Sequence, residues 1–343
     1  MSEDYEYEPA KWSAKTTFKS ARAAYKKKVV DAAPSRAKLK GPTKADALPK
    51  ELTTDCAGPV LISIDHTGSM GDWAAIVRGK LGYLDHEMRT EYRGEDVETC
   101  FLSIGDAHER EPHALQVRPF VSGGDMVKEL EVLDFGGGRR GGGGLHETYE
   151  LGALYLSRKF KAPKSTMKPV VIFIGDEMCY PAISPAMARD YCGIDLKRPI
   201  TTEQAFRDLR TFCSVYAILK PYRVRKDSDG TPVFDKSDPI NEQVYLDWVE
   251  LLGAGYVAPL PIPEDVVNVI FGILAREVDK VGYFKDEIDD RQKDVPERLK
   301  TVYTALHDIH KDAPKGVSDD DVGKSKIVRG MLPGKTKRTK RLI

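Results

Sequence analysis

Cysteine is scarce in this sequence of 343 residues, and long hydrophobic runs are missing. The few cysteines are odd in number and widely spaced, which argues against a disulfide framework: Cys56, Cys100, Cys179, Cys192 and Cys213. No apolar run is long enough to cross a bilayer, and the first residues, MSEDYEYEPA, lack the character of a signal peptide. We therefore expect a protein of the reducing cytoplasm, with no membrane partner.

Motifs of several catalytic and metal-binding classes are also missing. The glycine tract FGGGRRGGGGLHE, which contains residues 136–144, lacks the Gly-Lys-Ser/Thr ending of a P-loop. We interpret it as a mobile loop, with phosphate or RNA binding through Arg139 and Arg140 as the alternative. Cys179 and Cys192 have no Cys-x-x-Cys pair beside them, which argues against a zinc site. Because no nucleophile paired with a base stands out, we expect a protein that is not an enzyme.

Charge is balanced over the whole chain but unevenly distributed along it. Residues 9–50 carry twelve Lys and Arg against two acidic residues, and residues 324–343 carry eight basic residues and no acidic one. Residues 51–284 hold 26 basic and 36 acidic residues, a net charge of −10. The pattern predicts an acidic body with two basic arms. The arms are either solvated or resting on the body, or they bind an acidic partner such as nucleic acid.

Apolar strands alternate with amphipathic helices through the acidic part of the chain. The segments PVLISID, ETCFLSIGD, PVVIFIGDE and CSVYAIL predict buried strands, and ALQVRPFV predicts an edge strand because it contains Pro119. Helical periodicity lies between them, for example in DWAAIVRGKLGYLDHEMRTEY. This alternation predicts an α/β fold of the doubly wound type, with a mostly parallel central sheet covered by helices on both faces.

Four segments follow from composition and periodicity. We expect a basic N-terminal extension and linker over residues 1–56 and the α/β domain over residues 57–284. A charged helical extension over residues 285–323 contains VPERLKTVYTALHDIHK, which predicts one amphipathic helix. Residues 324–343 are expected to form a basic flexible tail.

Polar side chains follow directly on two of the predicted strands. Asp65 ends the first strand, with Thr67 and Ser69 on the turn after it, and Asp176 ends the strand PVVIFIGDE. Ligands of such sheets bind beyond the carboxyl ends of the strands, so these oxygens are expected to converge. Buried carboxylates and hydroxyls need a partner, and oxygen ligands suit Mg²⁺. The sequence therefore predicts a binding site for a divalent cation. The alternative is that Asp65, Thr67 and Ser69 form a helix N-cap and turn with no metal.

The same residues resemble those of a known family. DHTGSM, residues 65–70, is similar to the first metal-binding loop, Asp-x-Ser-x-Ser, of von Willebrand factor type A domains. The family's second element is a threonine after a glycine-rich turn, with Ala-Leu five and six residues later, and GGGGLHETYELGAL supplies Thr148 in that context. Its third element, an aspartate at the end of the central strand, is matched by Asp176. The resemblance covers roughly residues 58–283 and points to divergent bacterial or phage-like members.

This resemblance implies a Rossmann-like fold with a metal-ion-dependent adhesion site. The implied ligands are Asp65, Thr67, Ser69, Thr148 and Asp176, with Asp176 acting through water. The implied ion is Mg²⁺, or Mn²⁺ or Ca²⁺ in its place. Hydroxyl ligands are neutral and leave the metal with positive charge and an exchangeable position, which suits a carboxylate from another protein.

Two departures from the family pattern concern the site. Thr67 replaces a serine and keeps the hydroxyl, whereas Glu177 replaces a glycine and adds a carboxylate at the rim. Four further side chains could lie at the rim or behind the ligands: His66, Asp106, His146 and Glu147. Imidazole suits softer metals, so His66 is expected at the rim and not among the ligands.

The resemblance implies a function in protein–protein interaction. We expect a cytoplasmic adaptor or assembly domain that binds an acidic residue of a partner through the metal, and bacterial relatives suggest an AAA+ ATPase of the MoxR type as that partner. The first alternative is a metal-dependent phosphohydrolase using Asp65, although Thr67 stands where haloacid-dehalogenase enzymes have a second aspartate. The second alternative is nucleic-acid binding through the basic arms.

Overall fold

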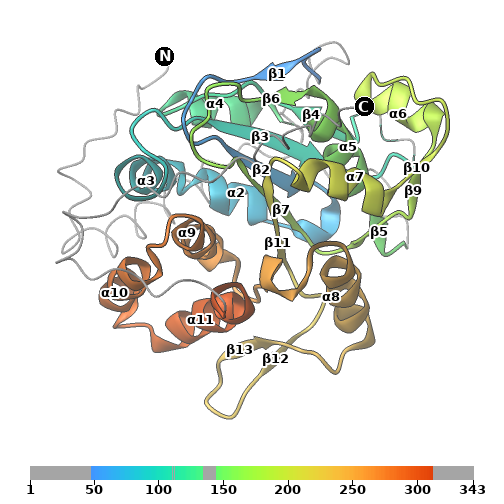
Figure 1. The fold of residues 1–343 in the computed structure, drawn as a ribbon. Helices are drawn as coiled ribbons and strands as arrows, with labels where there is room; N and C mark the ends of the chain where they lie inside the picture. Colours follow the sequence, from blue (N-terminus) through green and yellow to red (C-terminus); the bar gives the residue numbers. More distant parts are fainter. Residues whose placement is uncertain (1–47, 110, 112, 134–143, 312–343) are drawn as a thin grey trace, which may run out of the picture.

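The computed structural model describes residues 48–109, 111, 113–133 and 144–311. The tail expected over residues 324–343, most of the N-terminal extension and nearly all of the glycine-rich loop 136–144 lie outside the described residues. Within the described part, the architecture is a central sheet with helices on both of its faces (Figure 1).

The sheet has six strands in the order β14-β11-β7-β2-β3-β4. They are β2 (Val60–Asp65), β3 (Thr99–Ile104), β4 (Leu115–Val117), β7 (Val170–Gly175), β11 (Ser214–Leu219) and β14 (Val257–Pro259). All neighbours pair in parallel except β3 and β4, which are antiparallel. The predicted α/β class with a mostly parallel sheet is therefore confirmed, and the segment containing Pro119 supplies the edge strand β4.

Smaller strand pairs and a hairpin decorate this sheet. They are β1 (Leu52–Thr53) with β6 (Phe160–Lys161), β5 (His146–Glu147) with β8 (Met178–Cys179), β9 (Ala182–Ile183) with β10 (Ile200–Thr201), and the hairpin β12 (Val224–Lys226) and β13 (Pro232–Phe234).

Alternating side chains of the strands supply two hydrophobic clusters, one on each face. In β2, Val60, Ile62 and Ile64 face one cluster and Leu61 faces the other, as the two-residue period of a strand requires. The first cluster is completed by α2 (Trp73–Arg78), α3 (Leu81–Glu87), α4 (Asp125–Val132), α9 (Val266–Glu277), α10 (Val281–Gln292) and α11 (Pro296–His310). The second is completed by α5 (Tyr149–Lys159), α6 (Pro185–Cys192), α7 (Thr202–Arg210) and α8 (Pro239–Leu252).

The helix predicted after the segment DHTGSM is broken in two. A helical turn at Gly68–Met70 precedes α2, and the chain leaves the helix at Gly79 and Lys80 before α3 begins. Met88–Tyr92 then continues α3 as a π-helical turn. Glycine favours such an interruption because it costs a helix more conformational entropy than other residues do.

The edges of the expected domain fall inside packed structure. Residue 56 was the expected end of the N-terminal extension, yet Leu52 and Cys56 are both buried and β1 pairs in parallel with β6. Residue 284 was the expected end of the α/β domain, yet it lies within α10, where Phe284 and Ile288 are fully buried. Hydrophobic burial thus continues through α11, which forms one layer with α9 and α10 (Figure 1).

Candidate metal site at the carboxyl ends of the strands

Asp65 is the last residue of β2, and both of its carboxylate oxygens accept hydrogen bonds. Oδ1 accepts from the backbone N–H and the hydroxyl of Thr67, each at 2.7 Å. Oδ2 accepts from the hydroxyl of Tyr149 at 2.6 Å. Because the chain turns sharply after Asp65, the loop wraps back onto the carboxylate that ends the strand.

Three further side chains extend this contact across to the neighbouring strand β7. The hydroxyls of Thr67 and Ser69 are 3.0 Å apart, and Ser69 Oγ donates to Asp176 Oδ1 at 3.0 Å. Asp176 follows β7 directly and is fully buried. Four of the five residues predicted as ligands, Asp65, Thr67, Ser69 and Asp176, are therefore joined by consecutive hydrogen bonds.

A close approach at Gly175 lets Tyr149 reach Asp65. A Cβ atom at position 175 would lie 2.0 Å from the Tyr149 hydroxyl oxygen, so any side chain there would displace this ring. Gly175 is the last residue of β7, and Tyr149 opens α5 on the face of the sheet toward which Asp65 points. The absence of a side chain at Gly175 therefore leaves the space that the Tyr149 hydroxyl needs to donate to Asp65.

Thr148, the fifth predicted ligand, makes different contacts. Its hydroxyl donates to the carbonyl of Gly105 at 2.5 Å and accepts from the backbone N–H of Ala107 at 3.4 Å. The residue is fully buried at the start of α5, next to Tyr149. The structure thus places Thr148 beside the cluster, with its hydroxyl held by the loop that follows β3.

Lys220 was not among the predicted site residues, and it contacts Asp176 directly. Its ammonium nitrogen lies 2.8 Å from Asp176 Oδ2, the oxygen that Ser69 leaves free. The sequence does indicate this position. Lys220 directly follows the predicted strand CSVYAIL, just as Asp65 ends PVLISID and Asp176 directly follows PVVIFIG. We missed it because an ammonium is not a metal ligand. Tyr149 was missed because its neighbour Thr148 fitted the family motif.

Two glutamates bring further carboxyl groups close to the aspartates. Glu147 is only 5% exposed, and within the described residues its Oε2 has no hydrogen-bond partner. Glu177 Oε1 accepts from the hydroxyl of Tyr222 at 2.8 Å, and its backbone carbonyl accepts from the indole of Trp248. A buried carboxylate oxygen without a partner is costly, so Glu147 is the group that most needs a cation or a proton.

Burial and mutual repulsion raise the pKa of several of these carboxyls. Burial, followed by the charge of Asp176, raises the pKa of Asp65 to about 6. Burial also raises the pKa of Glu177 to about 7, opposed by its hydrogen bond from Tyr222. The pKa of Glu147 is raised by burial and then by the charge of Asp65. Proteins commonly relieve such crowding by binding a proton or a cation.

The remaining predicted rim residues form a separate group of hydrogen bonds and ring contacts along the β3 side of the site. His66 is buried, with Nδ1 2.7 Å from Ser103 Oγ and Nε2 3.1 Å from Glu111 Oε2. Asp106 Oδ2 accepts from the hydroxyl of Tyr180 at 3.0 Å. The rings of His108 and His146 both stack on Tyr180, with centroids 3.8 and 5.1 Å away. Both ring nitrogens of His66 thus contact protein groups.

The donor set fits a hard divalent cation in its chemistry. Carboxylate and hydroxyl oxygens are the ligands that Mg²⁺ and Ca²⁺ prefer. Only two of the connected side chains are carboxylates, and across the described residues no group of three or more His, Cys, Asp and Glu is arranged to hold a metal ion. The hydroxyls of Thr67 and Ser69 would therefore have to complete the set, and Lys220 would compete for Asp176.

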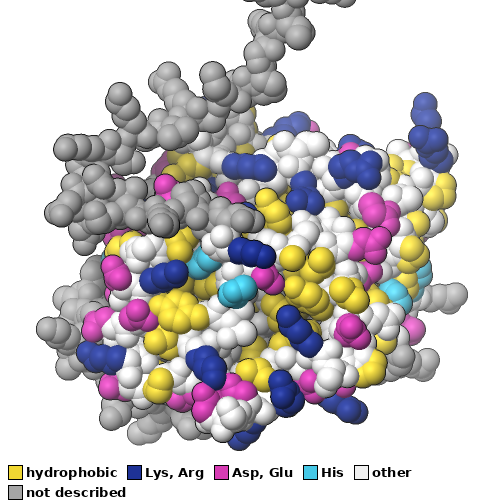
Figure 2. All heavy atoms as spheres, turned by 60° about the horizontal axis from the view of Figure 1, so that its bottom comes forward, with side chains coloured by type: hydrophobic (Ala, Val, Ile, Leu, Met, Phe, Trp, Pro, Cys, Tyr) yellow, Lys and Arg dark blue, Asp and Glu magenta, His cyan; other side chains and the backbone are white. Residues whose placement is uncertain are grey.

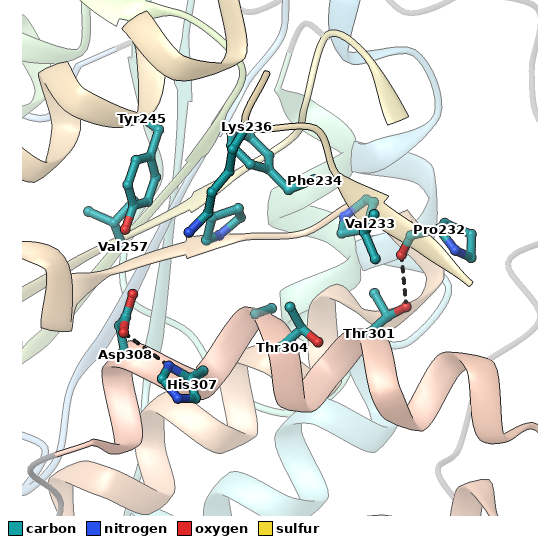
Figure 3. Close-up of a pocket in the computed structure, with 13 residues that line it drawn as sticks. Pro232, Val233, Phe234, Lys236, Tyr245, Val257, Thr301, Thr304, His307 and Asp308 are labelled. Carbon is teal, nitrogen blue, oxygen red and sulfur yellow. Dashed lines mark hydrogen bonds and ion pairs between the residues drawn. The ribbon is translucent and has the colours of Figure 1, made fainter. Parts of the chain in front are cut away.

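A hollow lies away from these residues. It has a volume of about 160 Å³ and is lined by β13, α8, β14 with the residues just after it, and α11 (Figure 3). Its walls combine Phe234 and Tyr245 with Lys236, His307 and Asp308, and Thr301 donates to the carbonyl of Pro232 across it. Figure 2 shows basic and acidic side chains interspersed over the face that it displays, with no field of a single sign. None of the lining residues belongs to the carboxylate cluster.

Within the part of the chain that the structure describes, no helix has the length and apolar character needed to cross a membrane. No protein-family model matches this chain, and no curated protein matches it.

Among solved structures, the chain is similar to two crystal structures of the pilus adhesin SpaC from Lactobacillus rhamnosus GG, with TM-scores of 0.40 and 0.41 and sequence identities of 9% and 12%. These similarities cover 72% of this chain and 31% and 32% of SpaC, so the chain spans about a third of that protein's length. It is also similar to proximal thread matrix protein 1 from the mussel byssus, with a TM-score of 0.40 and 11% identity, over 66% of this chain and 48% of that one. At these TM-scores the similarities carry no argument about function.

Proposed function

We propose that this chain binds a divalent cation through Asp65, Thr67, Ser69 and Asp176, and through that cation a carboxylate of a partner protein. The observation that carries the proposal is the unbroken series of contacts at 2.7 to 3.0 Å that joins these four side chains at the carboxyl ends of β2 and β7. Oxygens already held this close need little rearrangement to converge on one ion, which lowers the cost of ordering them.

The charge of the surroundings supports a cation. Asp65 and Asp176 bring two negative charges and Glu147 and Glu177 stand nearby, whereas Lys220 is the cation in contact with Asp176. The unpartnered Oε2 of Glu147 supports a cation for the same reason. Mg²⁺ is the ion we favour, with Mn²⁺ or Ca²⁺ as substitutes, because hydroxyl ligands leave room for water or a partner group.

The wider role rests on the resemblance to von Willebrand factor type A domains. On that basis the chain works in the cytoplasm as an adaptor or assembly component, and an AAA+ ATPase of the MoxR type is a candidate partner. The acidic residue of the partner would fill the exchangeable position of the metal. Thr148 would join the ligands through a lone pair of its hydroxyl oxygen, because the hydrogen bond to the Gly105 carbonyl uses only its proton.

The residue two positions after Asp65 weighs against a phosphohydrolase. Haloacid-dehalogenase enzymes have a second aspartate there, whereas this chain has Thr67, whose hydroxyl donates to Asp65 Oδ1. The nucleic-acid alternative depends on basic arms that lie largely outside the described residues.

Titration calorimetry of the full chain with MgCl₂ tests the metal site. We expect one binding event, and its loss in Asp65→Ala. Asp55→Ala is the matched control, because Asp55 is an exposed aspartate whose partner is the surface Lys164. No heat from the folded wild type at millimolar Mg²⁺ would contradict the proposal. A pull-down with Mg²⁺ or EDTA, read by mass spectrometry, then tests whether the metal recruits a protein.

A further inference from the structure

The pairing of β11 with β7 places Lys220 beside Asp176. Leu219 pairs with Gly175 at the ends of these parallel strands. The residues that follow the two strands, Lys220 and Asp176, therefore also lie side by side. The backbone N–H of Lys220 donates to the Gly175 carbonyl at 2.8 Å, which continues the ladder by one step. The position of this lysine is therefore fixed by the sheet and not by a surface loop.

The ammonium of Lys220 lies in a sheltered position. Its side chain is 24% exposed, Asp176 is fully buried, and the two charges are 2.8 Å apart. The ring of Tyr222 stands 5.8 Å from the ammonium, and its hydroxyl is tied to Glu177. The backbone of Tyr222 is itself held, because its N–H donates to Asn241 of α8. The lysine side chain can therefore leave Asp176 by rotating its own bonds, without a movement of the backbone.

A divalent cation and this ammonium cannot share Asp176 without cost. Ser69 already donates to Oδ1 of Asp176, and the lysine donates to Oδ2. A metal bound between Asp65 and Asp176 would stand within a few ångströms of the ammonium, and like charges repel strongly in such a sheltered place. Binding of the metal must therefore either displace the lysine or be weakened by it.

We propose that Lys220 is an internal counter-cation that competes with the divalent ion for Asp176 and thereby sets the metal affinity of the site. This inference rests on the proposed function, since it concerns the same ion. Without the metal, Lys220 neutralises a buried carboxylate. With the metal, its side chain swings away from Asp176. The site is accordingly loaded only at metal concentrations high enough to replace the lysine.

The test compares Mg²⁺ binding by full-length wild type, Lys220→Met, Lys220→Arg and Lys164→Met, with calorimetry and melting curves in EDTA and MgCl₂. Lys220→Met should bind Mg²⁺ at least about tenfold more tightly than wild type, because a neighbouring positive charge is gone. In EDTA it should melt at a lower temperature, because buried Asp176 loses its counter-charge. Lys220→Arg keeps the charge and should stay within about threefold of wild type. Lys164→Met removes an exposed lysine and should change neither value.

A second measurement uses the unaltered protein and keeps the test valid if Lys220→Met fails to fold. Brief acetylation with acetic anhydride, read by mass spectrometry, reports how accessible each lysine is. Saturating Mg²⁺ should increase the acetylation of Lys220 severalfold and leave that of Lys164 unchanged. Equal Mg²⁺ affinity in wild type and Lys220→Met, or an unchanged Lys220 reactivity while Mg²⁺ binds, would overturn the inference and leave the proposed function standing. Absence of Mg²⁺ binding in all variants would overturn both.

Discussion

At the scale of single residues, hydrogen bonds stabilise the ionised carboxylate of Asp65, whereas burial and the negative charge of Asp176 destabilise it. Three donors reach its carboxylate, from Thr67 and Tyr149, while burial and the neighbouring Asp176 raise its pKa to about 6. When the pKa of a carboxyl is raised in the folded state, its ionisation lowers the free energy of unfolding. At pH 8 the ionised Asp65 therefore destabilises the fold, and a bound metal would remove this effect.

Asp65→Asn should separate these two effects. The amide oxygen can still accept a hydrogen bond, and the repulsion of Asp176 is removed. We expect the melting temperature in EDTA at pH 8 to equal that of wild type or to exceed it by a few degrees. The rise in melting temperature on adding Mg²⁺ should disappear, because a ligand stabilises only a native state that binds it.

Melting curves of wild type, Asp65→Asn and the exposed control Asp55→Asn, each in EDTA and in MgCl₂, check this prediction. If Asp65→Asn unfolds in EDTA while Asp55→Asn does not, the aspartate acts as a structural cap of the loop and not as a metal ligand.

Much of this cluster could be predicted from the sequence, and the limits have physical causes. Asp65, Thr67, Ser69 and Asp176 follow buried strands directly, and parallel strands deliver such residues to one edge of the sheet. The hydroxyl of Thr148 could not be placed, because its choice of the Gly105 carbonyl depends on how the loop after β3 turns. Lys220 also follows a predicted strand directly. Its contact with Asp176 depends on β11 lying next to β7, and the order of strands in a sheet cannot be read from one sequence.

At the scale of elements, a buried ion pair joins the helices that follow the sheet. Asp265 precedes α9 and is fully buried, and both of its oxygens accept from Arg298 of α11. Gln292 of α10 donates to the same carboxylate at 2.8 Å. At Gly272 of α9 a Cβ atom would lie 2.1 Å from a methyl carbon of Leu306, so α11 packs there almost against the backbone of α9.

Arg298→Met should destabilise the protein by about 3–5 kcal/mol, because it leaves the carboxylate of Asp265 buried without its charged partner. Lys300→Met is the matched control on the same helix. Lys300 is 46% exposed and pairs with Asp227 and Asp229 at the surface, so its loss should reduce the stability much less than the loss of Arg298 does. Urea unfolding of both variants measures the difference. Equal losses would mean that the buried pair contributes no more than an exposed one.

A second element-scale prediction concerns Glu87 at the end of α3. Burial raises its pKa to about 7 from 4.5, with Arg291 lowering it and with Glu287 and Glu91 raising it further. The folded state therefore holds a proton that the unfolded state releases, and the stability gained is present below pH 4.5 and lost as pH rises toward 7.

Glu87→Gln should remove this loss. Relative to wild type, the variant should gain up to about 3 kcal/mol of stability as pH rises from about 4.5 to 7, and the difference should be level above that range. Urea unfolding at several pH values measures it, with the exposed Glu109→Gln as control. A difference that does not change with pH would show that the pKa of Glu87 is the same in the folded and unfolded states.

Elements with a continuous or periodic apolar pattern were predictable, and the helix α10, which lacks such a pattern, was not. The strands β2, β3, β7 and β11 lie within the segments predicted for them, because strands buried on both faces appear as apolar runs. The helix α10 was not predicted, because most residues of GYFKDEIDDRQ are charged. Its buried residues are Val281, Phe284, Ile288 and Gln292. The break between α2 and α3 was missed because amphipathic periodicity continues across it.

At the scale of the whole molecule, the hydrophobic core is larger than the segment in which strands and helices alternate. Leu52 belongs to one cluster and Val302, Leu306 and Ile309 belong to the other, and all four lie outside residues 57–284. Burying a large aliphatic side chain is worth about 1.5–3 kcal/mol, and a domain is stable by only about 5–15 kcal/mol in total.

The last prediction compares two fragments. Residues 48–311 contain both hydrophobic clusters in full, and the basic segments outside them have little apolar periodicity in the sequence. This fragment should therefore melt cooperatively within a few degrees of the full chain. Residues 57–284 lack β1 and α11, so the apolar faces of α9 and α10 would be exposed to water, and this fragment should show no cooperative transition.

Differential scanning calorimetry of the two fragments and the full chain decides the matter. Cooperative melting of residues 57–284 near the temperature of the full chain would mean that α11 is an appendage to an independent α/β domain. The opposite failure, in which residues 48–311 do not melt cooperatively, would assign a structural role to one of the basic arms. If both expectations hold, residues 48–311 are the better of the two fragments for testing the proposed metal site, because the strands that end at Asp65 and before Asp176 also pack against the layer that α11 completes.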